Sequence, residues 1–89
     1  MSKKEILDVW RNMPVYKLII EELISKPQGL SVRELLAVLK KEHGVELNRN
    51  ELHSALLKLE MNGLVYVEHI GNELVARLSP DFMKNIRRS

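Results

Sequence analysis

A polar stretch between residues 48 and 58 carries side chains that could bind a nucleic acid. Amide and hydroxyl groups can hydrogen-bond to base edges, and an Asn side chain suits adenine particularly well. Cationic groups beside them can reach phosphates or bases. The candidate contacts are Asn48, Arg49, Asn50, His53, Ser54 and Lys58. The alternative is an ordinary solvated helix surface with a capping Asn.

Other kinds of chemistry find little support in the residue types present. The chain has no Cys, which excludes a disulfide, a thiolate nucleophile and a Cys-type zinc site. None of the three His residues has a His or Cys partner three or four positions away, so we expect no metal and no cofactor. No paired-carboxylate, Ser/His/Asp or Gly-rich phosphate-binding signature is recognisable, so we expect no enzyme.

Length and composition indicate one small domain with an aliphatic core. The 89 residues are 45% hydrophobic but include only one Trp, two Tyr and one Phe. Leu, Ile and Val must therefore fill the core, which suits helices packed on a small sheet and leaves no evident small-molecule site. No apolar run approaches the roughly 18–20 residues that span a bilayer, so we expect a cytoplasmic protein with no membrane partner.

The excess of basic charge lies at the two ends of the chain. The formal net charge is +2, yet residues 28–79 hold six basic and seven acidic side chains. The basic excess therefore falls in residues 1–27 and 80–89. This distribution is a mild electrostatic footprint for a nucleic-acid-binding protein.

Two helices are predicted before residue 26. The first spans residues 1–13, opens with the capping-box pair Ser2 and Glu5, and has one apolar stripe. Pro14 fits the first turn of a helix and so begins a second one, which ends at Ser25. Lys26-Pro27-Gln28-Gly29 then stops the helix.

Two further helices follow, with caps at both ends. Ser31 and Glu34 form a capping box that opens the third helix, and Gly44 closes it. Asn48 or Asn50 caps the fourth, which runs to Asn62. Its predicted buried stripe consists of Leu52, Ala55, Leu56 and Leu59.

The hydrophobic period changes from helical to strand-like after Gly63. Residues 64–70 are rich in β-branched and aromatic side chains, and residues 73–78 alternate. Gly71-Asn72 between them predicts a two-residue hairpin turn. Ser79-Pro80-Asp81 then begins a short C-terminal helix, with Phe82 and Ile86 facing inward.

Taken in order, these pieces resemble the winged helix-turn-helix superfamily of the MarR, PadR and ArsR regulators. The resemblance covers about residues 14–82. The segments that carry it are Leu30-Ser31-Val32-Arg33-Glu34-Leu35, Leu47-Asn48-Arg49-Asn50, Leu56, Leu59-Glu60, Gly63-Leu64-Val65 and Ala76-Arg77-Leu78-Ser79-Pro80.

The resemblance implies how such a domain meets DNA. In this superfamily the third core helix, here about residues 48–62, lies in the major groove, and the wing touches the backbone or minor groove. The second core helix presents its N-terminus to phosphate, which implies roles for Ser31 and Arg33. The wing tip, residues 70–73, has no Lys or Arg, so Arg77 is its candidate contact.

Apolar residues outside the expected core suggest a partner. Leu57 and Met61 fall on the outward face of the predicted recognition helix, where they could pack against the N-terminal helix or form a protein interface. Ile6 and Trp10 on the 1–13 helix could pack on their own domain or form a homodimer. Residues 83–89 form a basic tail that could add phosphate affinity or simply fray.

We therefore expect an α+β winged helix-turn-helix: a three-helix core, a two-stranded β-hairpin wing, an extra N-terminal helix and a short C-terminal helix. The expected function is that of a homodimeric transcription regulator that binds double-stranded DNA. The alternative is a winged-helix protein–protein interaction module of transcription or replication machinery. The near-neutral 28–79 segment and the outward Leu57 and Met61 favour this alternative.

Overall fold

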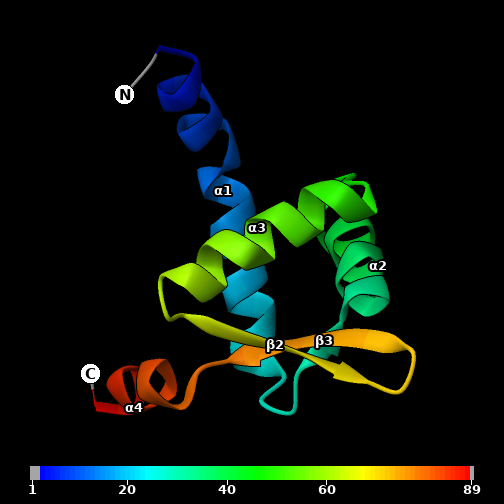
Figure 1. Ribbon diagram of the computed structural model, residues 1–89, viewed down its shortest axis with the longest axis vertical. Helices are drawn as coiled ribbons and strands as arrows, with labels where there is room; N and C mark the ends of the chain where they lie inside the picture. Colours follow the sequence, from blue (N-terminus) through cyan, green and yellow to red (C-terminus); the bar gives the residue numbers. More distant parts are fainter. Residues whose placement is uncertain (1–2, 89) are drawn as a thin grey trace.

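The described chain forms four helices and a three-stranded antiparallel sheet (Figure 1). The computed structural model describes the backbone of residues 3–88 and the side chains of residues 14–84. The sheet order is β1-β3-β2, so β2 lies at an edge. In chain order the elements are α1 (Lys3–Ser25), β1 (Leu30–Ser31), α2 (Val32–His43), α3 (Arg49–Met61), β2 (Val65–Ile70), β3 (Glu73–Leu78) and α4 (Pro80–Arg88).

Helix α1 is continuous through Pro14, so the predicted break at this residue is wrong. A proline inside a helix removes one hydrogen bond to the carbonyl four residues earlier. One missing hydrogen bond does not interrupt this helix of 23 residues, in which Pro14 is exposed. The predicted end of the helix at Ser25 is confirmed.

The predicted caps of α2 and α3 are confirmed. Ser31 and Glu34 form a reciprocal capping box on α2, with both hydrogen bonds at 3.0 Å. Asn48, rather than Asn50, caps α3 and forms the equivalent box with Glu51. Gly44 ends α2 in the left-handed conformation.

Strands β2 and β3 form the predicted hairpin around Gly71-Asn72. Its register pairs Ile70 with Glu73 at the turn and Val65 with Leu78 at the far end. The two-residue strand β1, which we did not predict, pairs with β3 and brings the start of α2 to the sheet. Gly29 precedes it with φ of 97°, and a Cβ there would lie 2.8 Å from the Ala76 carbonyl oxygen. The close approach of β1 to β3 therefore requires glycine at this position.

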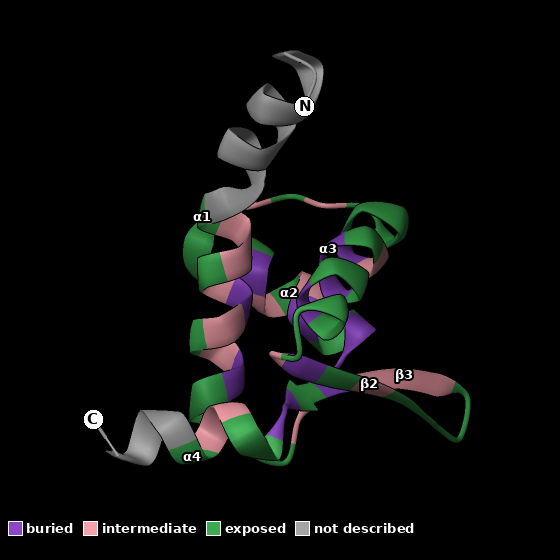
Figure 2. Cartoon of the chain, turned by 60° about the vertical axis from the view of Figure 1, so that its left-hand side comes forward, coloured by how far each residue is buried: buried purple, intermediate pink, exposed green. Residues whose placement is uncertain are grey.

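The core lies where α1, α2, α3 and the inner face of the sheet meet (Figure 2). The predicted buried stripe of α3 is confirmed, because all four of its residues are buried. Phe82 of α4 packs against this core, as predicted, whereas the side chain of Ile86 lies outside the described residues. The fully buried side chains include Ile19, Leu23, Leu35, Leu39, Leu52 and Val65.

This arrangement is a winged helix-turn-helix with an extra C-terminal helix. Helices α1, α2 and α3 make the helical core, and the β2–β3 hairpin is the wing. The additional N-terminal segment extends α1 instead of forming a separate helix. Helix α1 continues past the expected domain limit at residue 13, and helix α4 continues past the expected limit at residue 82. Within the described residues, no helix is long and apolar enough to cross a membrane.

Candidate nucleic-acid interface

Four elements meet around a surface hollow of about 210 Å³ that carries Arg33 and Arg49. Arg33 comes from the first turn of α2, Arg49 and His53 come from the first half of α3, and His69 comes from β2. Asn72 of the wing turn and Glu73 at the start of β3 complete the hollow. Cationic and hydrogen-bonding side chains far apart in sequence therefore gather on one surface.

Arg33 connects the two sides of this hollow. Its Nη2 lies 2.8 Å from Oε1 of Glu73 on β3, and both side chains are largely solvent-accessible. The pair joins the start of α2 to the wing and neutralises part of the positive charge. Arg49 has no ion-pair partner among the described side chains, so it contributes an uncompensated positive charge to the hollow.

The first half of α3 presents polar side chains beside the hollow. Asn50 and Ser54 are exposed, one turn apart, and His53 is partly buried next to them. Both exposed groups can accept and donate hydrogen bonds. Arg49, Asn50 and Ser54 are therefore exposed polar side chains within the first two turns of α3.

Two predicted contact residues serve the local fold instead. The Ser31 side chain is 2% exposed, and its hydroxyl accepts from the Glu34 N–H. It therefore has no surface to offer a phosphate. Asn48 is exposed, but its Oδ1 accepts from the Glu51 N–H at 2.8 Å. Its amide nitrogen remains available to a ligand.

Lys58 and Arg77 lie away from the hollow. Lys58 borders a different depression, between α3 and α1, together with Tyr16 and Ser54. Arg77 alternates onto the face of β3 opposite the buried Ala76 and Leu78, where its Nε lies 3.4 Å from Oε1 of Glu68. Figure 1 shows that this end of the sheet adjoins α4, at the opposite end from the wing turn. Arg77 is therefore separated from the α3 candidates.

The second half of α3 has an apolar surface, as predicted. Leu57 is 56% and Met61 78% exposed. Leu57 also lines a groove of about 250 Å³ between α3 and the inner face of the wing, opposite Val67 and Leu74. Ile6 and Trp10, the other predicted interface residues, have side chains outside the described residues.

His69, Asn72 and Glu73 complete the hollow but were not among the sequence-derived candidates. The hairpin register could have revealed these three residues. It places the last residues of β2 and the first of β3 at one end of the wing. The sequence could not show that this end meets the start of α2. That contact depends on β1, which is too short for a strand pattern to reveal.

A carboxylate of the chain itself, that of Glu34, lies at the N-terminus of α2. The Ser31 backbone N–H donates to the Glu34 carboxylate, and this bond, followed by the Ser31 hydroxyl, lowers the pKa of Glu34 below its ordinary value. A carboxylate at this terminus occupies the place where an anionic ligand would otherwise bind. Arg33, rather than the helix terminus, is therefore the candidate group for an anionic ligand at this end of α2.

Comparisons with known proteins relate this chain to winged-helix structures but not to a family. No protein-family model matches it, and no curated protein matches it. Similar solved structures include a transcriptional regulator from Clostridium thermocellum, with 18% identity over 99% of this chain and 82% of that one and a TM-score of 0.67. Another comes from a study of the DNA recognition and protein interaction domains of HOP2, with 22% identity over 72% of this chain and 97% of that one and a TM-score of 0.61. These similarities show the fold.

Proposed function

We propose that this chain is a winged-helix domain that binds double-stranded DNA and acts in transcription regulation. The observation that carries the proposal is the shared hollow of Arg33, Arg49, His53 and His69 beside the exposed Asn50. Cations at the rim of a polar helix can bind phosphates while the helix reads base edges. The transcriptional regulator and the HOP2 domain study among the similar folds are consistent with this function.

In the proposed complex, the first two turns of α3 enter the major groove. Asn50 and Ser54 reach base edges, whereas Arg49 and Arg33 bind phosphates on either side. The surface is suited to binding rather than catalysis, so we propose no enzymatic step. The domain acts as a homodimer, which would present two reading helices to half-sites about one helical turn apart.

The direct test is a fluorescence-anisotropy titration with duplex DNA at about 50 and 200 mM salt. We expect binding at the lower concentration and a linear fall of log affinity with log salt. Arg49→Ala should reduce the magnitude of this slope by about 0.9, because one phosphate contact is lost. No binding at low salt would overturn the proposal.

Lys41→Ala is the matched control. Lys41 is an exposed cation in the last turn of α2, at the other end of this helix from Arg33. The variant therefore makes the same change in net charge away from the hollow. It should leave the slope unchanged, and an equal effect of both variants would indicate binding through net charge alone.

A protein-interaction module is the second candidate, and it is favoured by the apolar half of α3. A reading helix that lay wholly in DNA would expose polar groups along its length, whereas Leu57 and Met61 are both exposed. Sedimentation of the wild type and of Leu57→Glu tests this surface. A dimer lost in the variant while DNA affinity per chain persists would assign the two halves of α3 to different partners.

A further inference from the structure

We propose that Glu22, Glu42 and His43 form a binding site for one divalent transition-metal ion, with Zn²⁺ as the best match. The site lies between α1 and α2, outside the candidate nucleic-acid interface. The sequence pattern predicted no metal, because it reveals only ligands that are close together in the chain. Here Glu22 and His43 are 21 residues apart and are brought together only by helix packing.

The donor atoms are already close to the spacing that a small ion requires. One ligand atom from each of the three residues lies within 4.8 Å of the other two. Nε2 of His43 and Oε1 of Glu22 are 3.0 Å apart. Bonds of about 2.0–2.2 Å to tetrahedral zinc place two ligand atoms about 3.4 Å apart. Side-chain rotations alone could therefore close the site.

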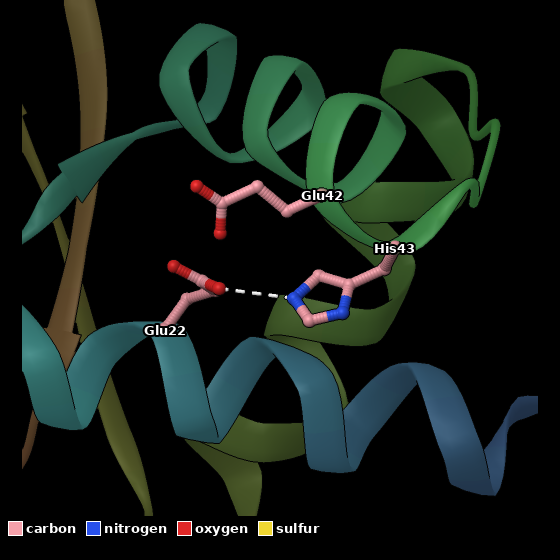
Figure 3. A group of neighbouring side chains, drawn as sticks. All are labelled: Glu22, Glu42 and His43. Atoms are coloured by element: carbon pink, nitrogen blue, oxygen red, sulfur yellow. Dashed lines mark hydrogen bonds and ion pairs between the residues drawn. The ribbon is translucent and has the colours of Figure 1, made fainter.

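The backbone holds two of the ligands at the end of a well-defined helix. His43 is the last residue of α2, and Gly44 caps the helix with an N–H bond to the Lys40 carbonyl at 3.1 Å. On α1, Glu22 precedes the fully buried Leu23, which anchors its helix in the core. Figure 3 shows the carboxylates of Glu22 and Glu42 converging from the two facing helices, with the His43 ring beside them.

The two carboxylates of the cluster favour a cation, against the opposing charge of Lys40 and Lys41 in the last turn of α2. Neither carboxylate has a Lys or Arg ion-pair partner among the described side chains. The C-terminal end of α2 also carries the negative end of the helix dipole. The hydrogen bond between Glu22 and His43 accounts for two members of the cluster but does not include Glu42, whose carboxylate lies beside that of Glu22.

The donor set and burial select the kind of ion. One imidazole and two carboxylates suit Zn²⁺, whereas Ca²⁺ and Mg²⁺ prefer oxygen ligands alone. The Glu22 and His43 side chains are 14% and 25% exposed, so they are partly shielded while the site stays open on one side. Water could take the fourth position of a tetrahedral ion.

Calorimetric titration of the untagged protein with Zn²⁺ tests the site, and visible absorption of bound Co²⁺ reports its geometry. We expect one ion per chain and a higher melting temperature with Zn²⁺, but no response to Mg²⁺. Loss of an outer-shell partner commonly lowers metal affinity about 10- to 100-fold, so His43→Gln should lower it at least about tenfold. His69→Gln is the matched control, since it removes an exposed His outside the cluster.

Glu42→Gln separates metal binding from a purely structural role. Glu42 is exposed and makes no ion pair among the described side chains, so Glu42→Gln should not lower the metal-free melting temperature. The same variant should weaken Zn²⁺ binding. Equal Zn²⁺ affinity in the wild type, His43→Gln and Glu42→Gln would overturn the proposal, as would loss of binding in His69→Gln. None of these measurements involves DNA, so they stand apart from the proposed function.

Discussion

Arg33 on α2 and Glu73 at the start of β3 form an ion pair that joins the wing to the helix-turn-helix, with Nη2 and Oε1 2.8 Å apart. The contact links the beginning of one helix to the turn of a hairpin 40 positions later. It also places a carboxylate within the hollow that we propose faces DNA. The pair therefore connects the wing to α2 and reduces the positive charge of this surface.

Glu73→Gln should raise DNA affinity at low salt, because it removes a negative charge from the hollow and frees Arg33 for phosphate. Arg33→Ala should lower the affinity and reduce the salt slope by about 0.9. Both variants should change the free energy of unfolding by less than about 1 kcal/mol, since the pair is exposed. Anisotropy titrations at several salt concentrations measure the first two effects.

The Glu68–Arg77 pair, which lies farther from the wing turn along the same hairpin, provides the control. Glu68→Gln makes the same chemical change within the same hairpin but away from the hollow. It should leave DNA affinity unchanged. A gain equal to that of Glu73→Gln would show that the position of the charge does not matter.

Leu56 and Leu57 are adjacent on α3 but should respond differently to truncation. Leu56 is 2% exposed, so Leu56→Ala should lower the free energy of unfolding by about 2–5 kcal/mol. Leu57 is 56% exposed, and Leu57→Ala should change it by no more than about 0.5 kcal/mol. Urea unfolding at low protein concentration provides the comparison. A large loss for Leu57→Ala would mean that this residue is buried in a dimer that persists under those conditions.

The α2 capping box should make stability dependent on pH through Glu34. Its pKa is lowered from the ordinary value of 4.5, first by the hydrogen bond from the Ser31 backbone N–H. A lowered pKa in the folded state stabilises the fold above the unfolded-state pKa and loses that effect as pH falls through the folded-state value. The urea midpoint of the wild type should exceed that of Glu34→Gln at pH 7 by a margin that shrinks below pH 4.5.

A pH-independent difference between these two proteins would contradict the role of the charged carboxylate. Ser31→Ala removes the other half of the box. It should cost about 0.5–2 kcal/mol at any pH where the protein folds.

Glycine should be required at position 29 for two reasons at once. Its φ of 97° is unfavourable for other residues, and a Cβ would lie 2.8 Å from the Ala76 carbonyl oxygen. We expect Gly29→Ala to lower the free energy of unfolding by more than about 2 kcal/mol. Gly44→Ala is the control, because Gly44 also has a positive φ but a Cβ there would meet no atom within 4 Å. Gly44→Ala should lower the free energy of unfolding by about 1–2 kcal/mol, which is the cost of the left-handed backbone conformation alone.

Local sequence signals determined most of the secondary structure and the wing. The caps at Ser31 and Asn48 and the Gly71-Asn72 turn depend on contacts between residues at most three positions apart, which a sequence displays directly. The buried stripe of α3 follows from helical spacing alone. The break expected at Pro14 was wrong, because the loss of one hydrogen bond does not interrupt a helix of 23 residues.

The sequence by itself therefore determined the fold class and the polar character of the first half of α3. Tertiary structure decided which candidates share a surface: it joined Arg33 and Arg49 with His69, buried Ser31, and separated Arg77. It also brought Glu22 to His43. Caps and stripes depend on neighbouring residues, whereas these groupings depend on how β1 and helix packing align distant segments, and no local pattern encodes that alignment.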